Sequence, residues 1–174
     1  LKQFVPSQVL SELQKFSQNL APRNQKVTIL FTDIRGFTKI SEALTPMALS
    51  ELLNLHYFFP LDTIIFKYNG TLEKHIGDSI MGIFGAPITM DDDAKRAVAC
   101  ALEMRSKVDE INREIRNKNV KIPVGFGIST GDSMVGIFGS AIRKEYTALG
   151  KPVNLAARLE RIAEEDQILI CSET

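Results

Sequence analysis

The stretch that decides the fold is Val27-Thr28-Ile29-Leu30-Phe31-Thr32-Asp33-Ile34-Arg35-Gly36-Phe37-Thr38. It is an apolar run that ends in a carboxylate and continues into a short loop with a glycine. The run predicts a buried strand over residues 27–33. A hard cation held by Asp33, beside backbone N–H groups left accessible at Gly36, is one way to bind a polyphosphate. An ordinary buried strand that happens to end in Asp is the alternative.

The composition is that of an ordinary globular domain. The 174 residues are 44% hydrophobic and 24% charged, which allows one domain with a sizeable core. Lys plus Arg and Asp plus Glu both total 21, so no basic field indicates nucleic-acid binding. No apolar run approaches the roughly 20 residues of a membrane span, and no signal peptide is expected in this stretch. Cys100 and Cys171 lie outside metal-ligand spacing and are expected to be buried thiols in a reducing compartment.

The order of the expected elements predicts an α+β fold. Residues 1–25 should form an N-terminal linker helix and a polar linker, and residues 26–174 a single domain. Thr45-Pro46 should begin a helix that kinks at Pro60. The remaining expected elements are strands 71–76 and 79–84, a helix over about 92–116, a hairpin of strands 123–130 and 133–138 turning at Gly131-Asp132, an extended piece at 146–149, a helix over 152–163 and a strand over 168–171.

The first six elements match the βαββαβ ferredoxin-like core, followed by additional C-terminal strand–helix–strand elements. Helices should pack on an antiparallel sheet and cover one of its faces. The other face would then be free, and a partner subunit could cover it.

Asp78 is a candidate second carboxylate, in the turn between the two central strands. That hairpin neighbours the first strand in a ferredoxin-like sheet, so Asp33 and Asp78 can converge. Two carboxylates at sheet ends can hold two Mg²⁺ ions about 3.5–4 Å apart for in-line phosphoryl chemistry. The alternative is that Asp78 serves the turn alone, where Asp is common.

Three further side chains carry possible chemistry. Lys74 stands in a short apolar strand, where it either reaches solvent or contacts a ligand. Asn154 and Arg158 are four residues apart and share one helix face. An amide beside a guanidinium suits a sugar oxygen and a phosphate that gains charge, and a solvated helix face is the alternative.

Four blocks of the sequence resemble the signature blocks of the class III nucleotidyl cyclases, in the family's order and at plausible spacing. The resemblance covers residues 26–174, and four blocks together are far more specific than any one. The blocks are Phe31-Thr32-Asp33-Ile34-Arg35-Gly36-Phe37-Thr38, Glu73-Lys74-His75-Ile76-Gly77-Asp78, Tyr146-Thr147-Ala148-Leu149-Gly150 and Val153-Asn154-Leu155-Ala156-Ala157-Arg158.

The resemblance implies a role for each matching position. Asp33 and Asp78 match the aspartates that bind two Mg²⁺ (or Mn²⁺) ions, and Ile34 the position whose carbonyl assists. Lys74 and Thr147 match the pair that reads the purine, and Asn154 and Arg158 the pair that orients the ribose and stabilises the transition state. The phosphate-binding loop matches Gly36, Phe37 and Thr38, and the cation for the triphosphate is Arg143 or Lys144, of which Arg143 is favoured.

The resemblance also implies an activity and partners. The family's catalytic domains act as dimers that share active sites, so a homodimer is expected. Lys74 with Thr147 resembles adenylyl cyclases, specifically the subgroup with Thr at the second purine-reading position. A lysine only donates hydrogen bonds, which suits N1 of adenine and opposes the N1–H of guanine. ATP is therefore the expected substrate, with cyclic AMP and pyrophosphate as products.

The family usually continues past residues 168–171, so the domain is expected to be truncated at its C-terminal end. A cytoplasmic location and an upstream regulatory domain in the full-length protein are expected, whether or not that protein is membrane-anchored. The alternative is a catalytically silent nucleotide-binding or dimerisation module, which would need at least one altered site residue, and none is found.

Overall fold

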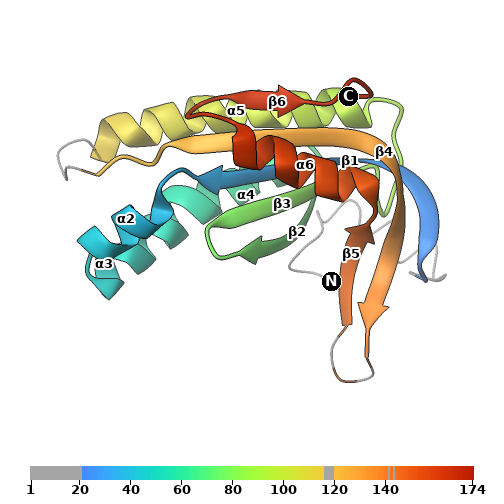
Figure 1. Cartoon of the computed structure of the whole chain (residues 1–174), viewed down its shortest axis with the longest axis horizontal. Coiled ribbons are helices and arrows are strands. Elements are labelled where there is room, and N and C mark those ends of the chain that lie inside the picture. The colour runs from blue at the N-terminus through green and yellow to red at the C-terminus, as the bar shows by residue number, and fades with distance from the viewer. Residues whose placement is uncertain (1–20, 116–119, 141, 143) are drawn as a thin grey trace.

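The computed structural model describes residues 21–115, 120–140, 142 and 144–174. The helix predicted over residues 1–17 lies outside this part of the chain. The elements, shown in Figure 1, are β1 (Arg23–Ile34), α2 (Phe37–Ala43), α3 (Pro46–Glu51), the π-helix η1 (Leu52–Phe58), α4 (Phe59–Lys67), β2 (Thr71–Ile76), β3 (Ser79–Phe84), α5 (Asp93–Glu114), β4 (Val124–Gly139), β5 (Lys144–Leu149), α6 (Lys151–Ile162) and β6 (Ile168–Ile170).

The six strands form one sheet in the order β2-β3-β1-β4-β5, with β6 pairing with β4 in parallel. The path from β2 to β4 is antiparallel throughout and has the strand order of the ferredoxin-like core. The expected fold class is therefore confirmed. The first strand is longer than predicted, because β1 begins at Arg23 and takes in three residues of the expected linker.

Residues 27–34 of β1 are mostly apolar because both faces of the strand are buried there, whereas residues 23–26 are polar and largely exposed. Leu30 and Ile34 belong to the core cluster that α4 and α5 cover. Ile29 and Phe31 belong to a second cluster on the opposite face, which includes Ala156 of α6. Alternating side chains of a strand point to opposite faces, so a strand buried on both sides reads as a continuous apolar run.

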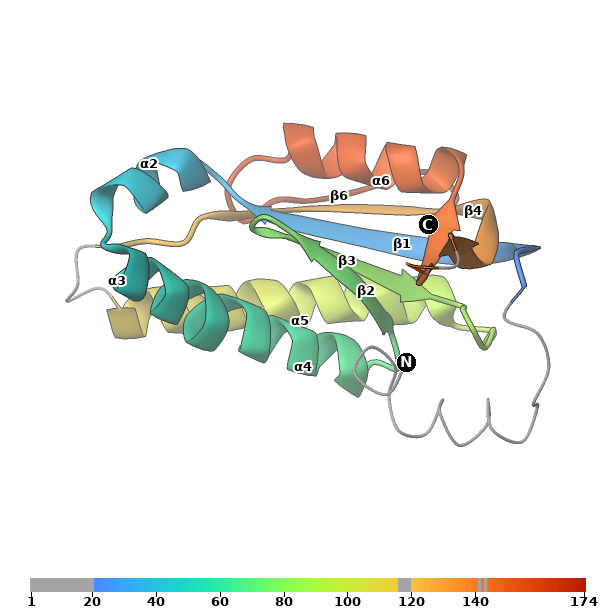
Figure 2. The ribbon, with the colours of Figure 1, turned by 90° about the horizontal axis from the view of Figure 1, so that it is seen from below.

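The helices occupy both faces of the sheet (Figure 2). α4 and α5 lie on one side, and α6 lies on the other. The prediction that one whole face would be free is therefore wrong. α6 packs so closely because β4 carries glycine where the helix crosses it: a Cβ added at Gly127 would collide with the backbone of Ala156 and Glu160.

The predicted hairpin at Gly131-Asp132 is also wrong. β4 runs without a break through both residues and stays paired with β1, where Gly131 lies opposite Val27 and Asp132 opposite Lys26. Gly131 lets α6 pack close to the strand and does not form a turn, since a Cβ there would lie 2.8 Å from Cγ of Pro152 in α6. The second strand of this region is instead β5, which pairs antiparallel with the far end of β4.

The first helical region differs from the prediction in two ways. Thr45 caps α3 as expected, with its hydroxyl accepting from the Ala48 N–H at 3.3 Å. The chain then winds as a π-helix just ahead of Pro60, whose missing N–H and ring disfavour a regular α-helical turn there. The short helix α2 was not predicted, and it begins directly after Gly36.

The cysteine prediction is half right. Cys100 is buried, whereas Cys171 is partly exposed, and both are free thiols. Ser129 donates a hydrogen bond to the sulfur of Cys171 at 3.5 Å. Among the helices of the described residues, none is long and apolar enough to span a membrane.

Substituting Gly127 should destabilise the fold through α6. Gly127→Ala places a methyl group against helix backbone that cannot rotate away, and we expect it to lower the free energy of unfolding by about 1–3 kcal/mol. Gly82→Ala in β3 is the matched control, because its Cβ would meet only side-chain atoms of Ile65, at 3.4 Å or more. Urea unfolding of both variants measures the difference, and equal losses would contradict this account of helix packing.

Candidate active site

Two carboxylates lie side by side where β1 ends and the β2–β3 hairpin turns. β1 and β3 pair antiparallel up to Thr32 and Ile80, so the end of one strand meets the start of the other. The Ser79 hydroxyl donates to Asp33 Oδ1 at 2.9 Å. The Ile34 N–H donates to Asp78 Oδ2 at 3.1 Å. The two predicted metal-binding aspartates therefore share one site.

The electrostatics of this pair fit a divalent cation. Burial, a hydrogen bond with Asp33 and repulsion from its charge together raise the pKa of Asp78 to about 7. Two adjacent carboxylates are costly to ionise together, and a bound cation removes that cost. The Tyr57 hydroxyl nearby stays neutral and does not offset the negative charge of the pair. Its burial, and then the two carboxylates, raise the pKa of that hydroxyl.

The described residues contain no group of three or more His, Cys, Asp or Glu side chains that could hold a metal ion. Asp33 and Asp78 would therefore supply only part of a coordination shell. Backbone carbonyls such as that of Ile34, and oxygens of a bound phosphate, are hard ligands that could complete it.

The predicted phosphate-binding loop, Gly36 to Thr38, forms the N-terminus of helix α2. Gly36 adopts φ +67°, a left-handed conformation that glycine tolerates, and α2 begins at Phe37. No side chain caps this helix, and the first N–H groups of any helix lack intrahelical acceptors. Phe37 packs against the main core while Thr38 is exposed. The segment thus presents backbone N–H groups, as the phosphate-binding role requires.

Arg35 anchors this segment to α6. Its guanidinium forms an ion pair with Glu160 and also donates to the Glu160 carbonyl at 2.6 Å. Its backbone N–H donates to the Pro123 carbonyl at 2.6 Å. The sequence pattern assigned Arg35 no role, and its place directly after the strand that carries Asp33 was the available signal.

The predicted purine-reading residues, Lys74 and Thr147, lie on β2 and β5, the two strands at opposite ends of the order β2-β3-β1-β4-β5. The Lys74 ammonium lies 2.9 Å from Glu73 Oε1 and 3.6 Å from Glu145 Oε2 of β5. Thr147, two residues further along β5, is buried. β4 bends and carries β5 back toward β2 (Figure 1), which is how two edge strands meet.

Asn154 and Arg158 are both exposed on α6. They line one side of a shallow hollow of about 370 Å³ whose other walls include Ser129 and Thr130 of β4. Across the described residues, no hydrogen bond or ion pair joins either side chain to Asp33 or Asp78. Arg143 lies outside the described residues, and the side chain of Lys144 is not described.

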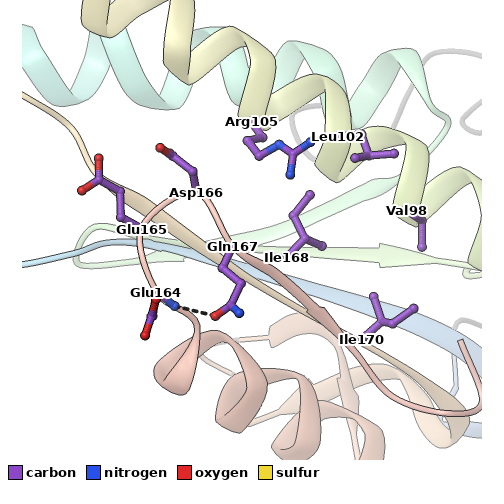
Figure 3. A pocket seen from close by; sticks show the side chains of 9 residues that line it. All are labelled: Val98, Leu102, Arg105, Glu164, Glu165, Asp166, Gln167, Ile168 and Ile170. Carbon is purple, nitrogen blue, oxygen red and sulfur yellow. Dashed lines mark hydrogen bonds between the residues drawn. The ribbon is translucent and has the colours of Figure 1, made fainter.

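A larger hollow of about 550 Å³ lies between α5 and β6 (Figure 3). Its apolar side chains come from both elements, and Arg105 and the acidic turn before β6 also line it. It contains none of the predicted site residues, so the sequence-derived site and this hollow are different places.

Comparisons with known proteins identify the family. Residues 20–174 match the family model described as the adenylate and guanylate cyclase catalytic domain. The chain belongs to this family. It is a class III nucleotide cyclase domain.

Relatives of this cyclase domain include both kinds of cyclase. Adenylate cyclase 1 of Rhizobium meliloti is 36% identical over 78% of the chain, and the adenylate cyclase of Anabaena cylindrica is 32% identical over 94%. The chain spans only 20% and 33% of these two relatives. The soluble guanylate cyclase gcy-31 of Caenorhabditis elegans is 31% identical over the whole chain and is matched over 25% of its length.

Solved cyclase structures superpose closely on this domain. The adenylyl cyclase CyaB from P. aeruginosa has a TM-score of 0.84 and 39% identity, covering 88% of this chain and 80% of that one. The guanylyl cyclase Cya2 has a TM-score of 0.82 and 38% identity, covering 87% and 77%. Overall similarity therefore identifies a cyclase domain without separating ATP from GTP as substrate.

The carboxylate pair should make stability depend on pH. Because the pKa of Asp78 is raised, its protonated form stabilises the fold at low pH, and this contribution is lost as pH rises through about 7. With chelator present, the wild type should lose about 1–2 kcal/mol relative to Asp78→Asn between pH 5.5 and 8.5, after allowing for solvent screening.

Urea unfolding at the two pH values measures this difference, with exposed Asp91→Asn as the control that should follow the wild type. Added Mg²⁺ should restore the wild type at pH 8.5 and leave Asp78→Asn unchanged. Parallel pH slopes for the wild type and Asp78→Asn would contradict a raised pKa of Asp78 in the folded protein.

Proposed function

We propose that this domain is an adenylyl cyclase that converts ATP to 3′,5′-cyclic AMP and pyrophosphate. The observation that carries the proposal is the position of Lys74, whose ammonium is held by Glu73 and Glu145 next to Thr147. Lysine has only hydrogen donors, so it pairs with the N1 acceptor of adenine. Guanine carries a hydrogen at N1, and two donors would then face each other.

We further propose that two copies of the chain share each active site. Asn154 and Arg158 are exposed and have no described contact with the carboxylate pair. A second copy would bring them to the nucleotide held at Asp33 and Asp78. An isologous dimer would build two such sites, each with one carboxylate pair and one α6 face.

Asp33 and Asp78, with the Ile34 carbonyl, would hold two Mg²⁺ (or Mn²⁺) ions. When bound, such ions lower the pKa of the attacking hydroxyl and neutralise the polyphosphate. The ribose 3′ oxygen attacks the α-phosphorus, the bond to pyrophosphate breaks, and the hydroxyl proton leaves to solvent. This chemistry needs no protein general base.

The chain's own residues would orient the reactants. N–H groups at Gly36, Phe37 and Thr38 would bind phosphate oxygens, and Arg143 would add a cation for the triphosphate. Asn154 would hold the ribose, and the Arg158 guanidinium would face the charge that builds on the α-phosphate. An upstream regulatory domain also belongs to the proposal, in keeping with the much greater length of the curated relatives.

The decisive experiment identifies the product formed from ATP and from GTP with Mg²⁺ or Mn²⁺. We expect cyclic AMP from ATP at a clearly higher kcat/KM than cyclic GMP from GTP. Specific activity should rise with protein concentration, since only the dimer has complete sites. Preferential formation of cyclic GMP would overturn the substrate assignment, and no product from either nucleotide would indicate a silent module.

Complementation tests the shared site. Asp33→Ala and Asn154→Ala chains should each lose about 100-fold or more in activity. Mixed in equal amounts, half of the dimers are heterodimers with one intact site of two, so about a quarter of wild-type activity should return.

The matched control mixes Asp33→Ala with Asp78→Ala. Both changes damage the same half of a site, so no heterodimer has an intact one and no activity should return. Recovery in this control, or none in the first mixture despite heterodimers seen by native mass spectrometry, would contradict a shared site.

A further inference from the structure

A β-bulge sets Glu73 beside Lys74. Leu72 lies opposite Gly82 and Lys74 opposite Met81, so Glu73 is the extra residue of β2. Successive side chains of a regular strand point to opposite faces. The bulge removes this alternation locally, and the carboxylate of Glu73 therefore reaches the ammonium of Lys74 at 2.9 Å.

The Glu73 carboxylate is buried and only partly satisfied. Its side chain is 1% exposed. Oε1 accepts from Lys74, while buried Oε2 has no hydrogen-bond partner among the described residues. A buried carboxylate oxygen without a donor is costly, so it attracts any hydroxyl that can reach it.

The hydroxyl within reach is that of Thr147. Burial raises the pKa of Glu73, and the Lys74 ammonium and the Thr147 hydroxyl each act to lower it again, which requires both groups to lie close to the carboxylate. In the single chain the Thr147 hydroxyl donates a long bond of 3.4 Å to the Ala148 carbonyl. A carboxylate is the stronger acceptor for the same proton.

The direction of this hydrogen bond matters for the ligand. An ionised carboxylate can only accept, so Thr147 must donate to it and has only lone pairs left for a base. Lone pairs accept from the 6-amino group of adenine and oppose the carbonyl oxygen of guanine at the same position. A threonine, which by itself could donate or accept, would thus act only as an acceptor.

We propose that Glu73 is a positioning residue for base selection: its carboxylate holds the Lys74 ammonium and accepts the hydrogen bond that the Thr147 hydroxyl donates, so that Lys74 and Thr147 together bind adenine and reject guanine. The inference rests on the proposed adenylyl cyclase activity and assigns selectivity to a residue that would not itself touch the base.

Glu73→Gln tests the inference, because glutamine keeps the shape but can donate as well as accept. We expect the ratio of kcat/KM for ATP to that for GTP to fall about tenfold, the factor of one hydrogen bond of average strength. Glu145→Gln is the control: it also removes a carboxylate beside Lys74, and it should keep the ratio whatever it does to the rate.

A second variant separates positioning from mere support of the fold. Thr147→Asp in the Glu73→Gln background supplies an acceptor that needs no partner, so the double variant should regain the ATP preference. Thr147→Val removes the hydroxyl without touching Glu73. It should lower the ratio of kcat/KM for ATP to that for GTP to a similar extent. This variant replaces Glu73→Gln as the test if Glu73→Gln does not fold.

The outcomes distinguish this inference from the proposed function. A wild-type domain that forms no cyclic AMP overturns the function. A wild-type adenylyl cyclase whose Glu73→Gln variant folds, loses rate equally with both nucleotides and keeps its ratio overturns only the inference. An unchanged ratio in Thr147→Val would do the same.

Discussion

The structure depends on the uninterrupted antiparallel pairing of β1 with β4. β1 is paired with β4 along its whole length, from Arg23 opposite Val135 to Ile34 opposite Val124. At one end this pairing fixes where β1 stops, and hence where Asp33 meets the β2–β3 hairpin. At the other end β4 continues beyond β1, bends, and returns through β5 to bring Thr147 toward Glu73 and Lys74. The metal-binding and purine-reading ends of the proposed site are therefore positioned by one ladder.

The same ladder forms the surface for α6. Glycines on β4 let the helix backbone lie against the strand, and the Arg35–Glu160 ion pair ties the helix to the end of β1. With one side of α6 committed to the sheet, Asn154 and Arg158 are held outward on the other. The packing that buries Ala156 thus presents the pair that the proposed dimer would need.

Both ends of the proposed site hold carboxylates in costly surroundings. The repulsion between Asp33 and Asp78 is what a divalent cation would relieve, and the unsatisfied oxygen of Glu73 is what the Thr147 hydroxyl would relieve. Such arrangements lower stability in the empty protein and favour the bound ligand, which is common at functional sites. The family resemblance gave roles to the aspartates, but it gave none to Glu73, whose position depends on a bulge.

The sequence by itself determined the βαββαβ order and the β2–β3 turn, and it named the residues proposed for the site, because apolar periodicity and short motifs are local signals. It also led to the prediction that Asp33 and Asp78 converge, through the neighbour relations of the fold class. Tertiary structure decided the rest. The local sequence at Gly131 predicts a turn, but the packing of α6 against this residue and its pairing with β1 keep it in an extended strand. Three further features depend on contacts between segments far apart in the chain, which no local pattern encodes. They are the covering of the second sheet face by α6, the bulge at Glu73 and the contact between β2 and β5.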